Sequence, residues 1–133
     1  MSQLIEVLQH LQKRPQMYFG GGEEARSIHL LEAFIIGFQT ARGAERMPSE
    51  PGDLDFFREW VGVHYRTLVD GQNGFVLILE HVGGDSKLAF DEFFRLLPLY
   101  LGDREQWGRE GILSRFTEIQ DVLWEQFRKG LRT

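Results

Sequence analysis

Cysteine is absent from this chain of 133 residues, which excludes disulfides, thiolate nucleophiles and cysteine-ligated zinc or iron–sulfur sites. Long apolar runs are also missing. The longest, from Phe75 to Leu79, ends at Glu80, far short of the roughly 20 residues that cross a bilayer. The start of the chain has neither the basic residues nor the apolar stretch of a secretory signal. We therefore expect a cytoplasmic protein that has no membrane partner and is stabilised by packing alone.

The composition predicts one globular domain. Hydrophobic residues make up 42% of the chain and aromatic residues 13%, and 11 phenylalanines supply much of the bulk that a core needs. A chain of 133 residues has the usual length of one domain and is too short for two ordinary ones. No internal repeat or low-complexity tract marks a boundary, so we expect a single helical domain over residues 1–133.

The formal net charge of -5 is concentrated in the middle of the chain. Residues 49–105 hold eleven acidic side chains against five basic ones, whereas the two flanking segments are close to neutral. An acidic segment repels a phosphate backbone, which argues against nucleic acid as the ligand and favours a basic protein partner. An ordinary solvated surface explains the same excess of acid, and this alternative stays open.

Apolar residues recur at helical spacing in six segments of the chain, which predict six helices. The first runs from near the start to Lys13, after Ser2 as its N-cap, and Pro15 ends it. The second begins at Glu23, because negative charge suits a helix N-terminus, and continues to about Ala41. This second helix is apolar around most of its circumference, so we expect it to be central.

The third predicted helix covers residues 53–64 and is capped by Asp53, after a surface loop at 43–52 that holds two prolines and two glycines. Residues 75–79 are ambiguous, because their β-branched content suits a buried strand. The apolar spacing over 75–82 suits a helix, however, and a lone strand has no partner. We therefore predict a helix there.

The fifth predicted helix starts at Asp85 or Ser86 as N-cap, and Pro98 should kink it or end it early. The sixth starts near Glu110 and runs almost to the end of the chain. Together these segments predict an all-α fold, a compact single-domain bundle of about six helices.

No spacing typical of a catalytic or metal site is found. The four histidines are too far apart in sequence to place two imidazoles on one helical face: His10, His29, His64 and His81. No serine lies in a nucleophile elbow. Three glycines at 20–22 are followed by two glutamates, which would repel phosphate, so a hinge explains them better. We expect no enzymatic activity, no metal and no cofactor.

The segment that follows the first predicted helix is dense in constrained residues. Pro15 should stop the helix, and Met17 with Tyr18 should fold back as an apolar plug. Arg14 has enough donors to hold loop carbonyls or helix ends. We therefore interpret the segment as a structural motif made of Arg14, Pro15, Met17, Tyr18 and Gly20.

This segment resembles the opening of the ATPase domain of DNA gyrase B subunits, where a Lys-Arg-Pro-Gly-Met-Tyr-Ile-Gly run precedes a helix with an essential Glu and Asn. Here Lys13 to Gly20 match the run, and Glu32 falls within the following predicted helix. Gly37 stands near the position of the Asn, and no Asp-x-Gly-x-Gly follows. The resemblance therefore does not support ATP hydrolysis.

A longer pattern resembles small bacterial proteins found beside polymorphic toxins, which are similar to immunity proteins. They share Arg-Pro-x-Met-Tyr-x-Gly, a Gly-aromatic pair, Phe-x-x-Trp and a late Ala-Phe-x-x-Phe-Phe. This chain matches within residues 14–97, at Arg14 to Gly20, Gly37-Phe38, Phe57-Arg58-Glu59-Trp60 and Ala89-Phe90-Asp91-Glu92-Phe93-Phe94. The resemblance implies an all-α protein that binds and blocks a toxin.

We therefore expect a protein-binding protein that inhibits a cognate, basic toxin through acidic residues in the middle of the chain. The alternative is a structural or regulatory adaptor without a toxin partner, built as a homodimer on exposed faces of the second or last predicted helix. A third interpretation is a small enzyme or nucleotide binder. The predicted partner-binding residues are Asp53, Asp55, Glu59, Asp85, Asp91 and Glu92.

Overall fold

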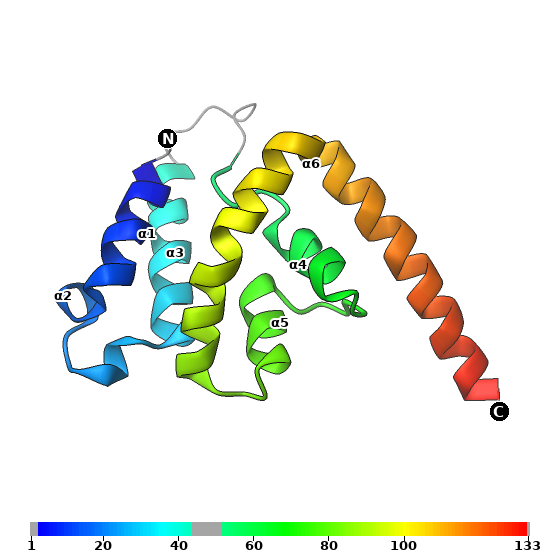
Figure 1. Cartoon of the computed structure of the whole chain (residues 1–133), viewed down its shortest axis with the longest axis horizontal. Helices are drawn as coiled ribbons and strands as arrows, with labels where there is room; N and C mark the ends of the chain where they lie inside the picture. The colour runs from blue at the N-terminus through cyan, green and yellow to red at the C-terminus, as the bar shows by residue number, and fades with distance from the viewer. Residues whose placement is uncertain (1–2, 44–51, 133) are drawn as a thin grey trace.

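The computed structural model describes residues 3–43 and 52–132 as a set of helices (Figure 1). No strand occurs in these residues, so the predicted all-α fold is confirmed. The predicted N-cap Ser2 and most of the loop predicted at 43–52 lie outside the described residues. In chain order the elements are α1 (Gln3–Lys13), α2 (Pro15–Phe19), the 3-10 turn η1 (Glu23–Ala25), α3 (Ile28–Gly43), α4 (Phe57–Tyr65), α5 (Gly74–His81) and α6 (Ser86–Arg132).

Two predicted helix starts are confirmed by their caps. The Asn73 Oδ1 atom accepts a hydrogen bond from the Val76 N–H at 2.9 Å, which begins α5 and resolves the ambiguous segment as a helix. The Asp85 Oδ1 atom accepts the N–H groups of Lys87 and Leu88, both at 3.0 Å, and begins α6. Each cap satisfies backbone donors that the first turn of a helix leaves without partners.

The second predicted helix begins later than expected. Glu23 lies in the short turn η1, and α3 begins at Ile28. The Ser27 Oγ atom accepts the Leu30 N–H at 3.4 Å, and the Ile28 N–H donates to Ser86 Oγ at 3.1 Å. Hydroxyl groups from two segments therefore satisfy the first donors of α3, and they join its start to the start of α6.

The prediction that Asp53 caps a helix is wrong. Residues 53–56 form a turn that ends at Phe56 in the left-handed region, with φ 57°, and α4 begins only at Phe57. Two side chains of α6 hold the backbone of this turn. Arg104 Nη1 donates to the Asp53 carbonyl at 2.6 Å, and the Tyr100 hydroxyl donates to the Asp55 carbonyl at 2.5 Å. Tertiary hydrogen bonds therefore replace the predicted cap.

Helix α6 continues through Pro98 and breaks at Gly108, where φ is 70° and ψ is 173°. Pro98 lies on the exposed side of the helix, so its ring does not enter the core. Tyr100, two residues on, is completely buried and keeps the helix on the core. Pro98 was expected to kink the helix or to end it early, and the early end is wrong, because the non-helical residue lies ten positions later, at Gly108.

One cluster of buried side chains joins α1, α3, α4, α5 and α6. Its largest fully buried members come from α4 and from the first half of α6: Trp60, Phe90, Phe93 and Tyr100. In Figure 1, α6 runs across the body with α1 and α3 on one side and α4 and α5 on the other. The apolar positions of α1 predicted from spacing, Leu4, Ile5, Leu8 and Leu11, are all buried in this cluster.

Candidate interaction surface

The Arg-Pro-x-Met-Tyr-x-Gly segment forms the junction between α1 and α2. Pro15 is buried and is the first residue of α2, where a missing N–H costs nothing. Gly20 ends α2 with φ 70°, and its N–H donates to the Gln16 carbonyl at 2.9 Å. A positive φ favours glycine, so these two residues explain the shape of the turn.

Met17 and Tyr18 do not form the predicted apolar plug. The exposed fraction is 70% for Met17 and 42% for Tyr18. Arg14 donates to no loop carbonyl within the described residues, and its Nη1 atom lies 3.9 Å from the Met17 sulfur. Three side chains of the predicted structural motif are therefore exposed: Arg14, Met17 and Tyr18.

These side chains line a cleft of about 710 Å³ together with two residues of α1. Lys13 and His10 complete its wall, and among the described residues no carboxylate lines it. Neither Lys13 nor Arg14 forms an ion pair with any residue in the described ranges. The cleft therefore combines positive charge with exposed apolar atoms on a chain that is acidic overall.

The cleft adjoins the outer side of α3. The ring of Tyr18 meets that of Phe34 edge-on, with 5.8 Å between their centroids. Arg42, in the last turn of α3, is exposed and charged. From His29 to Ala41 no exposed residue of α3 is an acid, a lysine or an arginine, and the exposed residues there are His29, Leu30, Ala33, Ile36, Gly37, Thr40 and Ala41. We name Met17, Tyr18 and these seven residues the α2–α3 surface.

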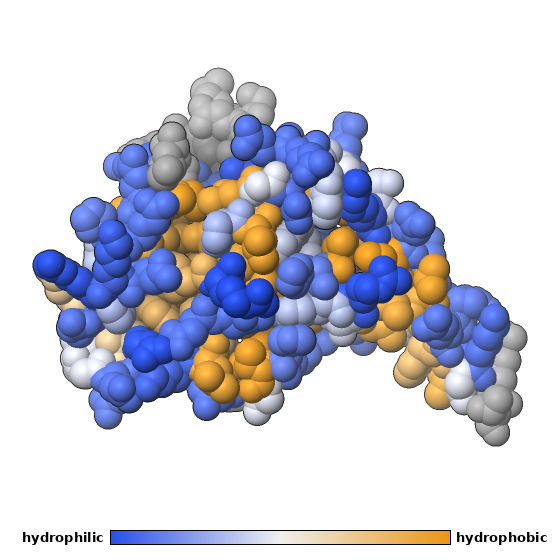
Figure 2. All heavy atoms as spheres, in the orientation of Figure 1, coloured by the Kyte–Doolittle hydropathy of each residue, from blue (hydrophilic) through white to orange (hydrophobic). Residues whose placement is uncertain are grey.

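The α2–α3 surface corrects the expectation that this helix is central. Ile28, Leu31 and Ile35 are its buried residues, whereas Leu30 and Ile36 are 41% and 51% exposed. Helix α3 is apolar on both its buried and its exposed sides. Apolar residues around most of a helix predict complete burial, so the sequence did not distinguish the two sides. In Figure 2 hydrophobic atoms reach the surface between α1 and α6, where Figure 1 places α3.

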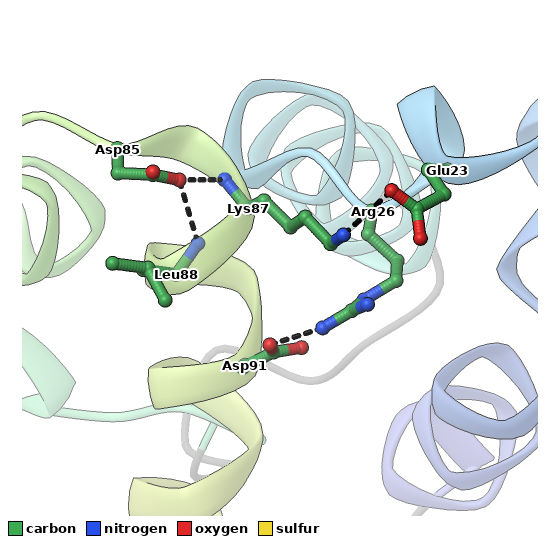
Figure 3. A network of polar contacts seen from close by, with 6 residues as sticks. All are labelled: Glu23, Arg26, Asp85, Lys87, Leu88 and Asp91. Carbon is green, nitrogen blue, oxygen red and sulfur yellow. Dashed lines mark hydrogen bonds and ion pairs between the residues drawn. The ribbon is translucent and has the colours of Figure 1, made fainter.

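Two of the acidic residues predicted to bind a partner lie in a network that joins η1 to the start of α6 (Figure 3). Asp91 pairs with Arg26, and Asp85 caps α6 with its carboxylate. Lys87 Nζ lies 2.7 Å from Glu23 Oε2 in the same network. These carboxylates therefore bind groups of their own chain.

The other predicted acidic residues also have partners within the chain. Asp55 Oδ2 lies 2.9 Å from Arg109 Nη1 across the turn before α4, and Asp53 contributes its backbone carbonyl there. Glu59 Oε1 lies 2.7 Å from Arg58 Nη2. The structure thus distributes the predicted residues over several intramolecular contacts instead of bringing all of them to one surface.

Glu92 has the strongest contacts of the predicted set. Its Oε1 atom lies 2.5 Å from Arg95 Nε, and its Oε2 atom accepts the Tyr65 hydroxyl at 2.5 Å. The hydrogen bond from Arg95, followed by that from Tyr65, lowers the pKa of Glu92 to about 2. Burial, together with the hydrogen bond to Glu92, raises the pKa of Tyr65.

Two histidines that seemed scattered meet around Tyr65. The rings of Tyr65 and His81 stack with centroids 3.8 Å apart and planes at 7°, and His64 stacks on Trp60 at 4.9 Å. Burial lowers the pKa of His64. The i, i+4 spacing of Trp60 and His64 could have predicted their contact, whereas the turn between α4 and α5 brings in His81. No group of three metal-binding side chains occurs in the part of the chain that the structure describes.

Comparisons of the chain with known protein families, with curated proteins and with solved structures find no match. Within the described residues, no helix has the length and apolar character needed to span a membrane.

Proposed function

We propose that this chain is a non-enzymatic binding protein whose partner is another protein, and that it acts as an immunity protein that neutralises a cognate bacterial toxin. The α2–α3 surface is the observation that carries this proposal. Along the exposed side of α3, from His29 to Ala41, no side chain is charged, and Leu30 and Ile36 are 41% and 51% exposed. A contiguous apolar area of this kind marks a binding surface on a small protein.

The composition of the neighbouring cleft supports a protein as the partner. Methionine, tyrosine and arginine are enriched in protein interfaces, and Met17, Tyr18 and Arg14 lie together at the end of α3's uncharged side. Arginine and tyrosine also supply a large share of binding energy where they occur. The choice of a toxin as the partner rests on the resemblance of residues 14–97 to immunity-like proteins. That this toxin is basic stays a prediction.

The proposed contact region, the α2–α3 surface, differs from the set of acidic residues that the sequence predicted to bind the partner. The carboxylates of Asp55, Asp91 and Glu92 form ion pairs within the chain, so a partner would have to break those pairs to use them. The α2–α3 surface needs no such exchange, because its exposed side chains are uncharged. We therefore place the main contact on α2 and α3.

The test is co-expression of the chain with the protein encoded beside its gene. The wild-type chain should restore growth and should form a complex on gel filtration. Leu30→Glu and Ile36→Glu should each abolish rescue, because a buried unpaired carboxylate at an interface costs several kcal/mol. Both sites are exposed, so the free energy of unfolding should change by less than about 0.5 kcal/mol.

Leu99→Glu is the matched control, since Leu99 is a similarly exposed leucine on α6. This variant should rescue growth as the wild type does. Full rescue by Leu30→Glu and Ile36→Glu would rule out the α2–α3 surface as the contact. Failure of the wild-type chain to bind or protect would rule out the toxin as partner.

A further inference from the structure

Lys13 and Arg14 place two positive charges at the wall of the cleft where α1 meets α2. Both side chains are exposed, and neither forms an ion pair with a described residue. Arg14 Nη1 lies 3.9 Å from the Met17 sulfur, which is a weak acceptor for one of the five N–H donors of a guanidinium. His10 lies one helical turn earlier and lines the same cleft. The wall of the cleft therefore has hydrogen-bond donors that remain available to an anion.

Other cationic side chains of the described chain are engaged within it. Arg26, Arg95 and Arg109 form ion pairs with carboxylates, and Lys87 pairs with a glutamate of η1 (Figure 3). Arg104 donates to backbone carbonyls of the turn before α4. The net charge of the chain is -5, so carboxylates are in excess over cations. The two cations of the cleft thus differ from these five by lacking a described acidic partner.

Lys13 is also free of a carboxylate on its second side. It lines another hollow, of about 470 Å³, together with Glu23. Lys87 Nζ lies 2.7 Å from Glu23 Oε2, so this carboxylate already has a partner. Within the described residues no carboxylate therefore neutralises Lys13 from either hollow.

Met17 and Tyr18 give the cleft an apolar part beside its charged part. Its volume of about 710 Å³ lies within the range of roughly 300–1,000 Å³ that is typical of ligand pockets. A lone anion such as inorganic phosphate would leave most of this volume and both apolar side chains unused. A nucleic acid would bring many phosphates close to an acidic chain, which repels them. A peptide segment with a carboxylate and apolar side chains uses both parts of the cleft.

We propose that the cleft receives an acidic segment of the partner protein, with a carboxylate bound by Lys13 and Arg14 and an apolar neighbour against Met17 and Tyr18. This inference rests on the proposed function, because it specifies the chemistry of the protein that binds the α2–α3 surface. Charge complementarity selects the occupant, since ammonium and guanidinium donors match carboxylate oxygens. The overall charge of a partner acts at longer range, so a basic toxin can present an acidic segment here.

The first experiment needs no toxin. The isotope-labelled full chain is titrated with the peptide acetyl-Leu-Glu-Glu-Leu-Phe-amide, and its amide signals are followed by nuclear magnetic resonance. The peptide should shift the signals of the five residues that line the cleft, with a dissociation constant on the order of 1 mM, because a short flexible peptide loses much entropy on binding. A control peptide with lysine in place of both glutamates should bind at least roughly tenfold more weakly, as should inorganic phosphate.

A double variant, Lys13→Gln with Arg14→Gln, should weaken binding of the glutamate peptide roughly tenfold, because both cations are lost. The matched control is Arg66→Gln with Lys129→Gln, which removes the same charge from exposed positions outside the cleft. It should bind the peptide as the wild type does, and circular dichroism should show both double variants folded. The proposal is overturned if the glutamate peptide does not bind, if it binds the cleft variant equally well, or if the lysine peptide or phosphate binds as tightly.

Co-expression with the protein encoded beside the gene separates failure of this inference from failure of the proposed function. Isothermal titration calorimetry should show that the cleft variant binds that protein roughly tenfold more weakly than the wild type, whereas the control variant binds equally well. Equal binding by the cleft variant and the wild type overturns the acidic contact and leaves the proposed function standing. A wild type that binds the glutamate peptide but not the neighbouring protein overturns the toxin as partner and leaves the preference of the cleft for acidic peptides standing.

Discussion

At the scale of single residues, Glu92 shows how an acidic side chain of this protein is used. Its carboxylate is bound by Arg95 of the same helix and by the hydroxyl of Tyr65 at the end of α4, so it joins two elements of the body. The Glu92 side chain is only 12% exposed, so its contacts are partly shielded from water. A charge held in this way should contribute to stability rather than to encounter with a partner.

Glu92→Gln should lower the free energy of unfolding by about 1–2 kcal/mol at neutral pH, because the ion pair is lost and its arginine partner is solvated. The pKa of Glu92 falls from 4.5 to about 2 on folding. Its contribution is therefore complete above pH 4.5 and is lost as the pH falls towards 2. Urea unfolding of wild type and variant between pH 2 and 7 should show the two curves converging in that window.

Glu80→Gln is the control for this measurement, because Glu80 is exposed on α5 and forms no ion pair with a described residue. Its free energy of unfolding should follow the wild type at every pH. A difference between Glu92→Gln and wild type that persists unchanged at pH 2 would show that the charge of Glu92 is not the stabilising feature.

The roles of single side chains were the part least accessible from sequence. Spacing predicted that the first helix ends before Pro15, and α1 ends at Lys13. It also predicted an N-cap at Asp85 or Ser86, and Asp85 is the cap, because a helix start depends on local backbone donors. It could not assign partners to Asp91 or Glu92, because Arg26 and Tyr65 come from distant elements. Exposure of Met17 was also out of reach, since an apolar residue type does not say which side of a short helix meets the core.

At the scale of elements, helix α6 is interrupted at Gly108 and not at Pro98, where a break was expected. Pro98 lies in a continuous helix, whereas Gly108 interrupts it with φ 70° and ψ 173°. That region is accessible essentially to glycine alone. The break turns the second half of α6 so that Ile112 is buried and Gln120 reaches the backbone of Thr67.

Gly108→Ala should therefore lower the free energy of unfolding by about 1–3 kcal/mol, because alanine is strained in this conformation. Straightening the helix would relieve the strain only by removing Ile112 and Gln120 from their contacts. Gly102→Ala is the matched control, since Gly102 is helical and has open space around its Cβ position. It should stabilise the protein by about 0.5–1 kcal/mol. Equal effects of the two changes in thermal unfolding would contradict the role given to Gly108.

The helices themselves were largely predictable, whereas their ends were not. Apolar spacing located α1, α5 and the buried positions of α6, because burial of one side of a helix repeats every three or four residues. The start of α3 depends on Ser86, and the turn before α4 depends on Arg104. Both partners lie more than 50 positions away in the chain, so no local pattern could reveal them.

At the scale of the whole molecule, the two exposed apolar regions lie on different elements. The α2–α3 surface belongs to the first part of the chain, whereas Phe127 and Leu131, 48% and 72% exposed, lie on the last turns of α6. The core cluster has members on α1, α3, α4 and α5 and ends at Ile112 on α6. The last turns of α6 therefore lie outside the core that holds the body together.

This arrangement predicts that the last turns of α6 can be removed without unfolding the body. A chain that ends at Glu125 keeps Ile112 and the hydrogen bonds of Gln120 but lacks Phe127, Arg128 and Leu131. Its free energy of unfolding should stay within about 1 kcal/mol of the full chain, because exposed residues contribute little.

A chain that ends at Gly111 is the comparison, because it loses the buried Ile112 and both hydrogen bonds of Gln120. Its free energy of unfolding should fall by about 4 kcal/mol or more, since burial of an isoleucine alone contributes about 2–5 kcal/mol. Thermal unfolding followed by circular dichroism measures the stability of both shortened chains. If the chain that ends at Glu125 unfolded as readily as the shorter one, the residues beyond Glu125 would stabilise the body, contrary to this prediction.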